Sequence, residues 1–275
     1  MATLAHDGLT FFYRDEGVGF PFVFQHGLGS DVNQPFELYA PAPGVRLIGF
    51  DARAHGQTHP LGDVKKVSLA QTGDDLVALL DALGIERAVV GGISMGASVA
   101  LSVALRYPSR VVGLVVVRPA WIDRPLPDNT RVFPHIALHL HHHGPEKGLA
   151  LFRQTPEYRA IQEVSEAAAA SLEAQFSHPH AVEFISRLER IPHDCPCHER
   201  EELTAINVPT LVMGNRRDPV HPWEMAQSVA GLIPGAVLVE LTPKGTSTER
   251  HAVEAQHAID SFFRRHFLLN LKSAP

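Results

Sequence analysis

The sequence is poor in the residues that build disulfide frameworks. Among its 275 residues there are two cysteines, Cys195 and Cys197, and only Pro196 separates them. So close a pair is a poor disulfide candidate, and two thiols make no framework. Proteins without disulfides are typical of reducing compartments. The sequence therefore predicts a cytoplasmic protein.

Two further absences concern membranes and nucleic acids. No apolar run reaches the ~20 residues of a membrane-spanning helix. The first residues, MATLAHDGLTFFYRDEG, do not follow the pattern of a signal peptide. The formal net charge is -6, and no basic patch stands out. We therefore expect a soluble protein that binds neither nucleic acid nor an anionic membrane surface.

What the chain does have is an alternation of short apolar strands and amphipathic helices. Hydrophobic residues make up 45% of it, which is enough for a sizeable core. Strand patterns occur at 9–14, 22–25, 45–50, 88–91 and 111–117, and helical patterns at 68–83 and 95–106. This order predicts an α/β fold with a mostly parallel central sheet flanked by helices.

The alternation stops at residues 118–120 and resumes much later. Residues 121–205 contain helical patterns and no convincing strand, whereas strand patterns return at 208–214 and 236–241, before a closing helix at about 250–267. We therefore predict one α/β core, residues 1–119 and 206–275, with an inserted helical segment at 120–205.

A candidate nucleophile follows the strand pattern that ends near residue 91. Gly92-Ile93-Ser94-Met95-Gly96 matches G-x-S-x-G, although this short pattern also arises in strand–helix junctions of small residues. Ligands of open parallel sheets bind at the carboxyl ends of the strands. Ser94, Asp218 and His251 all follow strand patterns, in the order Ser, Asp, His that is typical of serine hydrolases on this architecture.

Four motifs on both sides of the helical segment carry a family resemblance: HGLG at 26–29, DARAHGQT at 51–58, GISMG at 92–96 and VPTLVMGNRRDPVHP at 208–222. The chain resembles the α/β-hydrolase fold family, in its small cofactor-free esterase, lactonase and perhydrolase branch. The resemblance implies that the helical segment is a cap over the pocket. It also implies that neither a cofactor nor a metal is needed.

The resemblance assigns a role to each candidate. Ser94 would be the nucleophile, the backbone N–H groups of Leu28 and Met95 would form the oxyanion hole, and Asp218 would orient the histidine. An Asp before Pro is also a common turn former. Asp51 and Arg53 are interpreted as stabilising the loop beside the oxyanion hole.

The catalytic histidine departs from the family pattern. The family usually carries it in a G-H step just after the last strand, but here residues 242–246 read TPKGT. His251 is the first histidine after that strand and is predicted as the base. Either a longer loop lets His251 reach Ser94, or the triad is incomplete. His257, one and a half helical turns further on, should face another way.

Four residues are candidates for the substrate pocket: His26, Arg118, Trp121 and His221. Arg118 and Trp121 stand where the strand at 111–117 opens into the helical segment. Arg118 could recognise a substrate carboxylate or pair with an acid such as Asp123. His221 could line the site or be an ordinary loop residue.

Two histidine-rich stretches raise the question of a metal. His139 and His143 have i, i+4 ligand spacing but no accompanying acid in an H-E-x-x-H pattern. Residues 193–198, HDCPCH, lack a second pair of ligands at zinc spacing. We therefore predict no metal site.

Together these features predict a serine hydrolase that cleaves a small-molecule ester or lactone through an acyl-enzyme. Peracid formation or amide cleavage would use the same parts. Dehalogenases and epoxide hydrolases of this fold carry Asp where this chain has Ser94, so their chemistry is excluded. A non-catalytic ligand-binding receptor or an inactive paralogue is the alternative, and the sequence leaves a homodimer open.

Overall fold

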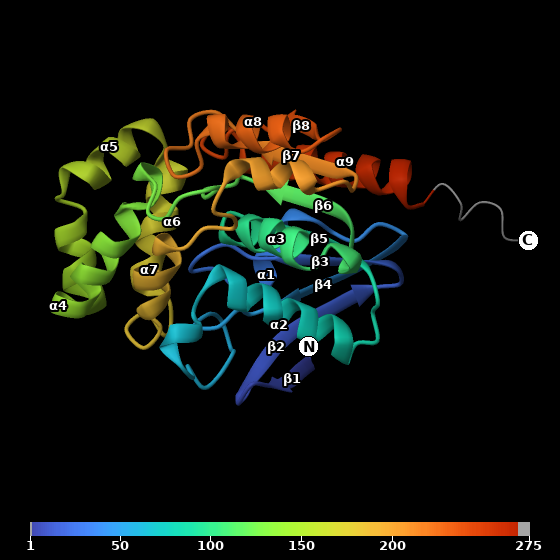
Figure 1. Cartoon of the computed structure of the whole chain (residues 1–275). Helices are drawn as coiled ribbons and strands as arrows, with labels where there is room; N and C mark the ends of the chain where they lie inside the picture. Colours follow the sequence, from blue (N-terminus) through green and yellow to red (C-terminus); the bar gives the residue numbers. More distant parts are fainter. Residues whose placement is uncertain (1, 269–275) are drawn as a thin grey trace, which may run out of the picture.

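The computed structural model describes residues 2–268, built on one eight-stranded sheet (Figure 1). The strand order is β1-β2-β4-β3-β5-β6-β7-β8, and the pairs from β4 to β8 are parallel. The predicted α/β fold with a mostly parallel sheet is therefore confirmed. The strands are β1 (Ala2–His6), β2 (Leu9–Gly17), β3 (Gly19–Gln25), β4 (Gly44–Phe50), β5 (Ala88–Ile93), β6 (Val111–Val117), β7 (Thr210–Gly214) and β8 (Val237–Glu240).

One strand, β1, was not predicted. It pairs antiparallel with β2 at the edge of the sheet, and β2 pairs antiparallel with β4. Strand β1 has no buried residue, whereas every residue of the central strand β5 is buried. An edge strand without an apolar run gives little sequence signal, because hydrophobic patterning reports burial.

Helices cover both faces of the sheet. Apolar residues of α2 (Leu69–Ala82), α3 (Met95–Arg106) and α8 (Trp223–Leu232) belong to the core on one face. On the other face, α9 (Thr248–His266) contributes Ile259 and Phe263, and α1 (Asn33–Leu38) packs Phe36 against the same cluster. Both faces are therefore covered, as parallel sheets require.

Between β6 and β7 the described chain contains helices and no strand. In Figure 1 helices α4 to α7 lie together beside the sheet rather than on either of its faces. The α-helices are α4 (Val132–Phe152, kinked at Gly144), α5 (Pro156–Val164), α6 (Glu166–Ser177) and α7 (Ser186–Arg190), with short 3-10 turns at Asp128–Thr130, Ile191–His193 and Arg200–Ala205.

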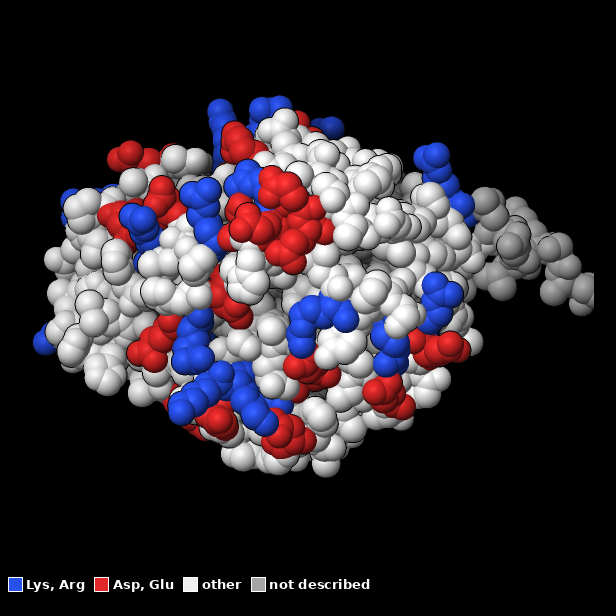
Figure 2. Space-filling view, in the orientation of Figure 1, with Lys and Arg blue, Asp and Glu red and all other residues white. Residues whose placement is uncertain are grey.

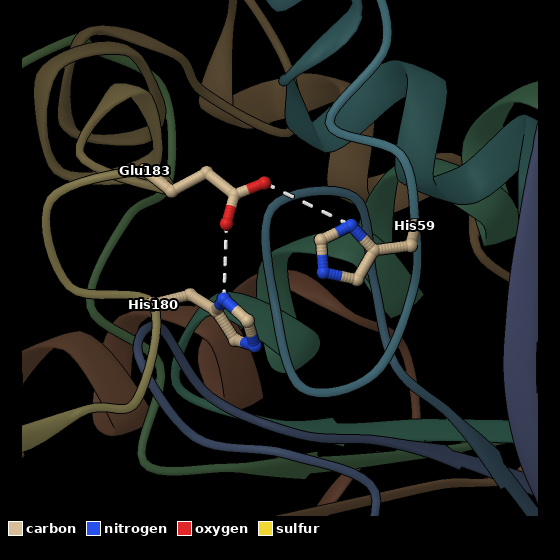
Figure 3. Close-up of side chains that lie close together, drawn as sticks. All are labelled: His59, His180 and Glu183. Atoms are coloured by element: carbon tan, nitrogen blue, oxygen red, sulfur yellow. Dashed lines mark hydrogen bonds and ion pairs between the residues drawn. The ribbon is translucent and has the colours of Figure 1, made fainter.

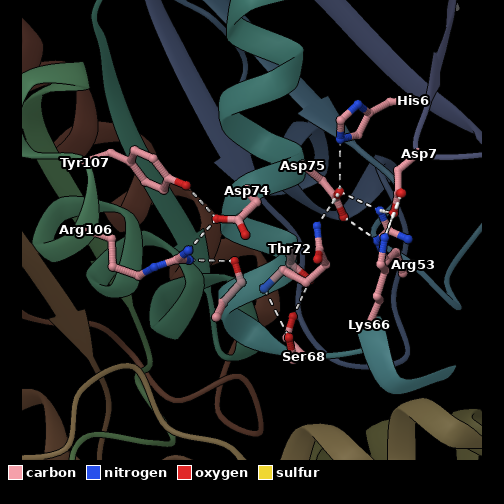
Figure 4. A network of polar contacts seen from close by, with 12 residues as sticks. His6, Asp7, Arg53, Lys66, Ser68, Thr72, Asp74, Asp75, Arg106 and Tyr107 are labelled. Atoms are coloured by element: carbon pink, nitrogen blue, oxygen red, sulfur yellow. Dashed lines mark hydrogen bonds and ion pairs between the residues drawn. The ribbon is translucent and has the colours of Figure 1, made fainter. Parts of the chain in front are cut away.

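A polar network fixes the loop that follows β4 (Figure 4). The buried guanidinium of Arg53 donates two hydrogen bonds to Asp75, of 2.7 and 2.8 Å, and one of 2.8 Å to Asp7. Asp51 accepts the backbone N–H groups of Val32 and Gln57, each at 2.7 Å. Both side chains thus hold this loop in place, as the sequence suggested.

Charges of both signs are interspersed on the face shown in Figure 2. Within residues 2–268, no helix combines the length and the apolar character needed to cross a membrane.

Candidate active site

Ser94 occupies a strained turn between β5 and α3. Its backbone has φ 57° and ψ -111°, a conformation that residues other than glycine rarely adopt. The flanking glycines make the turn possible. A Cβ on Gly92 would lie 2.0 Å from the backbone of Gly96, and a Cβ on Gly96 would lie 2.2 Å from the Gln25 carbonyl oxygen. Strain of this kind is typical of functional sites.

The hydrogen-bond partner of Ser94 is His221. The distance from Ser94 Oγ to His221 Nε2 is 2.8 Å, and that from His221 Nδ1 to Asp218 Oδ2 is 3.0 Å. Because a carboxylate accepts hydrogen bonds, Nδ1 carries the proton and Nε2 is left to accept the hydroxyl proton of Ser94. Asp218 Oδ1 also accepts the backbone N–H groups of Val220 and His221, which fix the carboxylate. Ser94, His221 and Asp218 therefore form one continuous chain of hydrogen bonds.

Burial and charge set the protonation of this chain. Burial raises the pKa of Asp218, but His221 and Arg118 outweigh it and hold that pKa well below its usual range. Burial lowers the pKa of His221, and the charge of Asp218 opposes this only in part. At neutral pH His221 is therefore a neutral imidazole beside an ionised carboxylate, which is the state a general base requires.

The two residues expected to supply oxyanion donors stand beside Ser94 in different ways: Leu28 lines the same cavity as Ser94, and Met95 directly follows Ser94 in the chain. Met95 is the first residue of α3, where backbone N–H groups have no acceptor within the helix. Within residues 2–268, neither the Met95 nor the Leu28 N–H donates a backbone hydrogen bond. The Leu28 loop is held on both sides: Gly27 N–H donates to Gln34 Oε1 at 2.7 Å, and Gln175 of α6 donates to the Leu28 carbonyl at 3.3 Å.

His251, the predicted base, lies elsewhere. The residue is 1% exposed, and its Nδ1–H donates to the Thr242 carbonyl at 2.8 Å. Its Nε2 has no hydrogen-bond partner among the described residues. The expected contact between His251 and Ser94 is therefore corrected: His221, expected only to line the pocket, takes that place.

Two of the expected pocket residues belong to the core instead. His26 is fully buried, where it donates to the Gly27 carbonyl and accepts the Ala52 N–H at 3.1 Å, so it fixes the loop. Trp121 is also fully buried and donates to the Pro192 carbonyl at 3.4 Å. Neither lines the cavity at Ser94, whereas Arg118 and His221 do.

That cavity, of about 100 Å³, lies between the sheet and the helical segment. Its polar wall comes from loops at the carboxyl ends of the strands. Its apolar wall comes mainly from α4 and α6, through Phe133, Ala168 and Leu172. A space of this size and lining suits a small, partly apolar molecule.

Lys244 lines the cavity and was missed by the sequence analysis. It lies in the loop after β8, where the resembling family usually carries its histidine. Proximity to Arg118, followed by burial, lowers its pKa to about 8. Its place in the sequence could have indicated this, because a residue in the loop after β8 can reach the same cavity.

One group of side chains has metal-ligand character (Figure 3). Glu183 accepts a hydrogen bond of 2.9 Å from His180 Nδ1 and lies 3.8 Å from His59 Nδ1. The ring nitrogens of the two histidines and the carboxylate oxygen of Glu183 that could bind a metal ion lie within 4.8 Å of one another. Each side chain is 37 to 46% exposed. The contact of Glu183 with His59 joins the loop after β4 to the helical segment.

Comparison with known proteins agrees with the fold. The sequence model of the alpha/beta hydrolase fold matches residues 21–247. A putative carbamate hydrolase, RutD, from Caulobacter sp. (strain K31) is 33% identical over 214 residues, which cover 76% of each chain. The enol-lactonase from Burkholderia xenovorans LB400 superposes with a TM-score of 0.74 at 23% identity, over 95% of this chain and 99% of that one. An esterase from Thermogutta terrifontis gives 0.70 at 24% identity, over 96% and 97%.

Proposed function

Because the chain belongs to the α/β-hydrolase fold family, we propose that it is a serine hydrolase that cleaves a small carboxylic ester or lactone through an acyl-enzyme. The observation that carries the proposal is the hydrogen-bond chain from Ser94 through His221 to Asp218. The family and its named relatives support hydrolysis. The serine mechanism and the ester or lactone substrate are our inference.

In the first half-reaction, His221 Nε2 removes the Ser94 hydroxyl proton as Oγ attacks the substrate carbonyl carbon. Asp218 holds the ring in the required tautomer and stabilises the imidazolium that forms. The carbonyl oxygen becomes an oxyanion between the N–H groups of Leu28 and Met95, each typically worth ~3 kcal/mol of barrier. His221 then protonates the leaving alcohol oxygen as its bond to carbon breaks.

In the second half-reaction, water replaces the alcohol. His221 takes a proton from the water, whose oxygen attacks the acyl carbon. The tetrahedral intermediate collapses, the acid leaves, and the proton returns to Ser94. The apolar wall from α4 and α6 would select the acyl or alcohol group, which gives the helical segment at 120–205 the role of a cap.

The test is active-site labelling combined with turnover. A fluorophosphonate should label the wild type and not Ser94→Ala, and p-nitrophenyl acetate should be hydrolysed only by the wild type. Thermal melting of both proteins checks that Ser94→Ala is folded. A wild type that is folded, unlabelled and inert would overturn the proposal and favour a ligand-binding protein without turnover.

A further inference from the structure

Arg118 is held rigidly at the edge of the cavity. It is the first residue after β6 and has φ 48°, a left-handed conformation that is costly for a residue other than glycine. Its backbone N–H donates to the Met213 carbonyl at 2.7 Å, which fixes this turn. The side chain is 12% exposed and therefore largely withdrawn from solvent.

The charge of Arg118 is poorly neutralised. Its one ion-pair partner within residues 2–268 is Asp218, and Nη1 to Oδ2 is a long contact of 3.4 Å. The same carboxylate already accepts hydrogen bonds from the His221 ring and from two backbone N–H groups. Arg118 Nε is buried without a hydrogen-bond partner in the described part of the chain. An arginine has five N–H donors, so most of this fork is unused.

Lys244 adds a second cation to the same cavity. No carboxylate lies within 4.0 Å of its ammonium group among residues 2–268. The other titratable groups nearby do not compensate. Asp218 is committed to His221, Glu37 of α1 is exposed to solvent, and His251 is neutral because burial lowers its pKa to about 4.

Two cations therefore face one cavity whose single buried acid is already engaged. We propose that Arg118 and Lys244 form a carboxylate subsite beside Ser94, so that the preferred substrates are small esters or lactones that carry a free carboxylate. This inference rests on the proposed function and names the substrate class of the same site. Arginine offers two parallel donors to a carboxylate, and lysine a third at a different angle.

Two matched pairs of esters test the proposal. Monoethyl succinate and ethyl 4-oxopentanoate differ in a carboxylate on the acyl side, where the second compound has a methyl ketone. Acetoxyacetate and acetoxyacetone differ in the same way on the alcohol side. Carboxylate recognition should raise kcat/KM of the anionic member by at least about tenfold in one of the pairs, mainly through KM, since such charge-assisted bonds are the strong ones.

The variant Lys244→Met keeps the length of the side chain and removes its charge. It should lower the ratio of anionic to neutral kcat/KM toward one, with Arg118 left to bind the carboxylate alone, whereas Lys244→Arg should keep the preference. Because the readout is a ratio within one protein, a general loss of folded enzyme cancels. Lys65→Met is the matched control, since Lys65 is exposed on the 3-10 turn at Val64–Lys66, and its ratio should equal that of the wild type.

The outcomes separate this inference from the proposed function. If neither member of either pair is hydrolysed and the fluorophosphonate does not label Ser94, the proposed function fails. If neutral and anionic esters are cleaved equally well by the wild type, or if Lys244→Met keeps a wild-type preference, the subsite is refuted and the hydrolase remains.

Discussion

Asp218 and His221 stand three residues apart in one loop, and the carboxylate binds the histidine through both its ring and its backbone N–H. The turn that follows β7 thus carries the proposed acid and the proposed base together. The loop after β8, where the resembling family usually carries its histidine, contributes Lys244 to the cavity instead. The histidine that contacts Ser94 thus comes from the loop after β7 rather than from the loop after β8.

The two candidate histidines make opposite predictions on substitution. His221→Ala should lower kcat for p-nitrophenyl acetate by a factor of about a thousand or more, because it removes the base. His251→Ala should leave kcat within a few-fold but lower the free energy of unfolding by about 1–3 kcal/mol, since it removes a buried hydrogen bond to Thr242. Turnover and urea unfolding of both variants distinguish the roles. A large loss of kcat in His251→Ala, with His221→Ala active, would restore the assignment from sequence.

The pH dependence of turnover should follow His221 on the acid side. The general base must be neutral, and burial lowers its pKa below the ordinary 6.5, against the opposing charge of Asp218 and with a smaller contribution from Arg118 and Lys244. For a neutral ester, the midpoint of the acid limb of kcat/KM should therefore lie below pH 6.5. Stopped assays across pH 4.5 to 8 report this limb, and a midpoint at or above 6.5 contradicts the assignment.

A second limb should appear only for esters that carry a carboxylate. The pKa of Lys244 is about 8, so its charge is lost as the pH rises through that value. The value of kcat/KM for the preferred anionic ester should then decline above pH 8, whereas its neutral partner should not share this decline. Lys244→Met should remove the difference between the two profiles, and identical profiles in the wild type would speak against the subsite.

Folding stability should fall as the solution becomes acidic. Burial lowers the pKa of His26 and of His251 to about 4, from 6.5. Unfolded chains bind these protons below pH 6.5 and the folded protein does not, so stability present above 6.5 is lost between about 6.5 and 4. For the fully buried His26 the loss is roughly 3 kcal/mol.

Urea unfolding at pH 7.5, 6.0 and 5.0 measures this slope. His26→Gln should flatten it, while His142→Gln, at an exposed position of α4, should follow the wild type. An unfolding free energy that stays constant from pH 7.5 to 5.0 is incompatible with neutral buried histidines.

Gly96, two residues after Ser94, should not tolerate a methyl group. In Gly96→Ala the new Cβ would lie 2.2 Å from the Gln25 carbonyl oxygen, so the backbone beside Ser94 must shift. We expect a loss of both stability and fluorophosphonate labelling. Gly231→Ala in α8 is the control: its Cβ meets nothing within 4 Å, and replacing a helical glycine should stabilise the protein by about 0.5–1 kcal/mol. Wild-type labelling of Gly96→Ala would show that the close approach is dispensable.

The sequence by itself determined most of the sheet and the tight turn at Ser94, because both depend on local patterns. Continuous apolar runs predict strands buried on both faces, as in β5 and β6, and the small residues around Ser94 predict a tight junction. Asp218 was predicted because the strand pattern ends just before it. The edge strand β1 was not predicted, because none of its residues is buried and it therefore has no apolar run.

Only the tertiary structure decided which histidine meets Ser94. Ser247 caps α9, so His251 falls within its first turn and directs Nδ1 back to Thr242. Chain order places both histidines after strands, but the direction of a ring depends on the packing of the element that bears it. The same reason accounts for the burial of His26 and Trp121 and for the entry of Lys244 into the cavity.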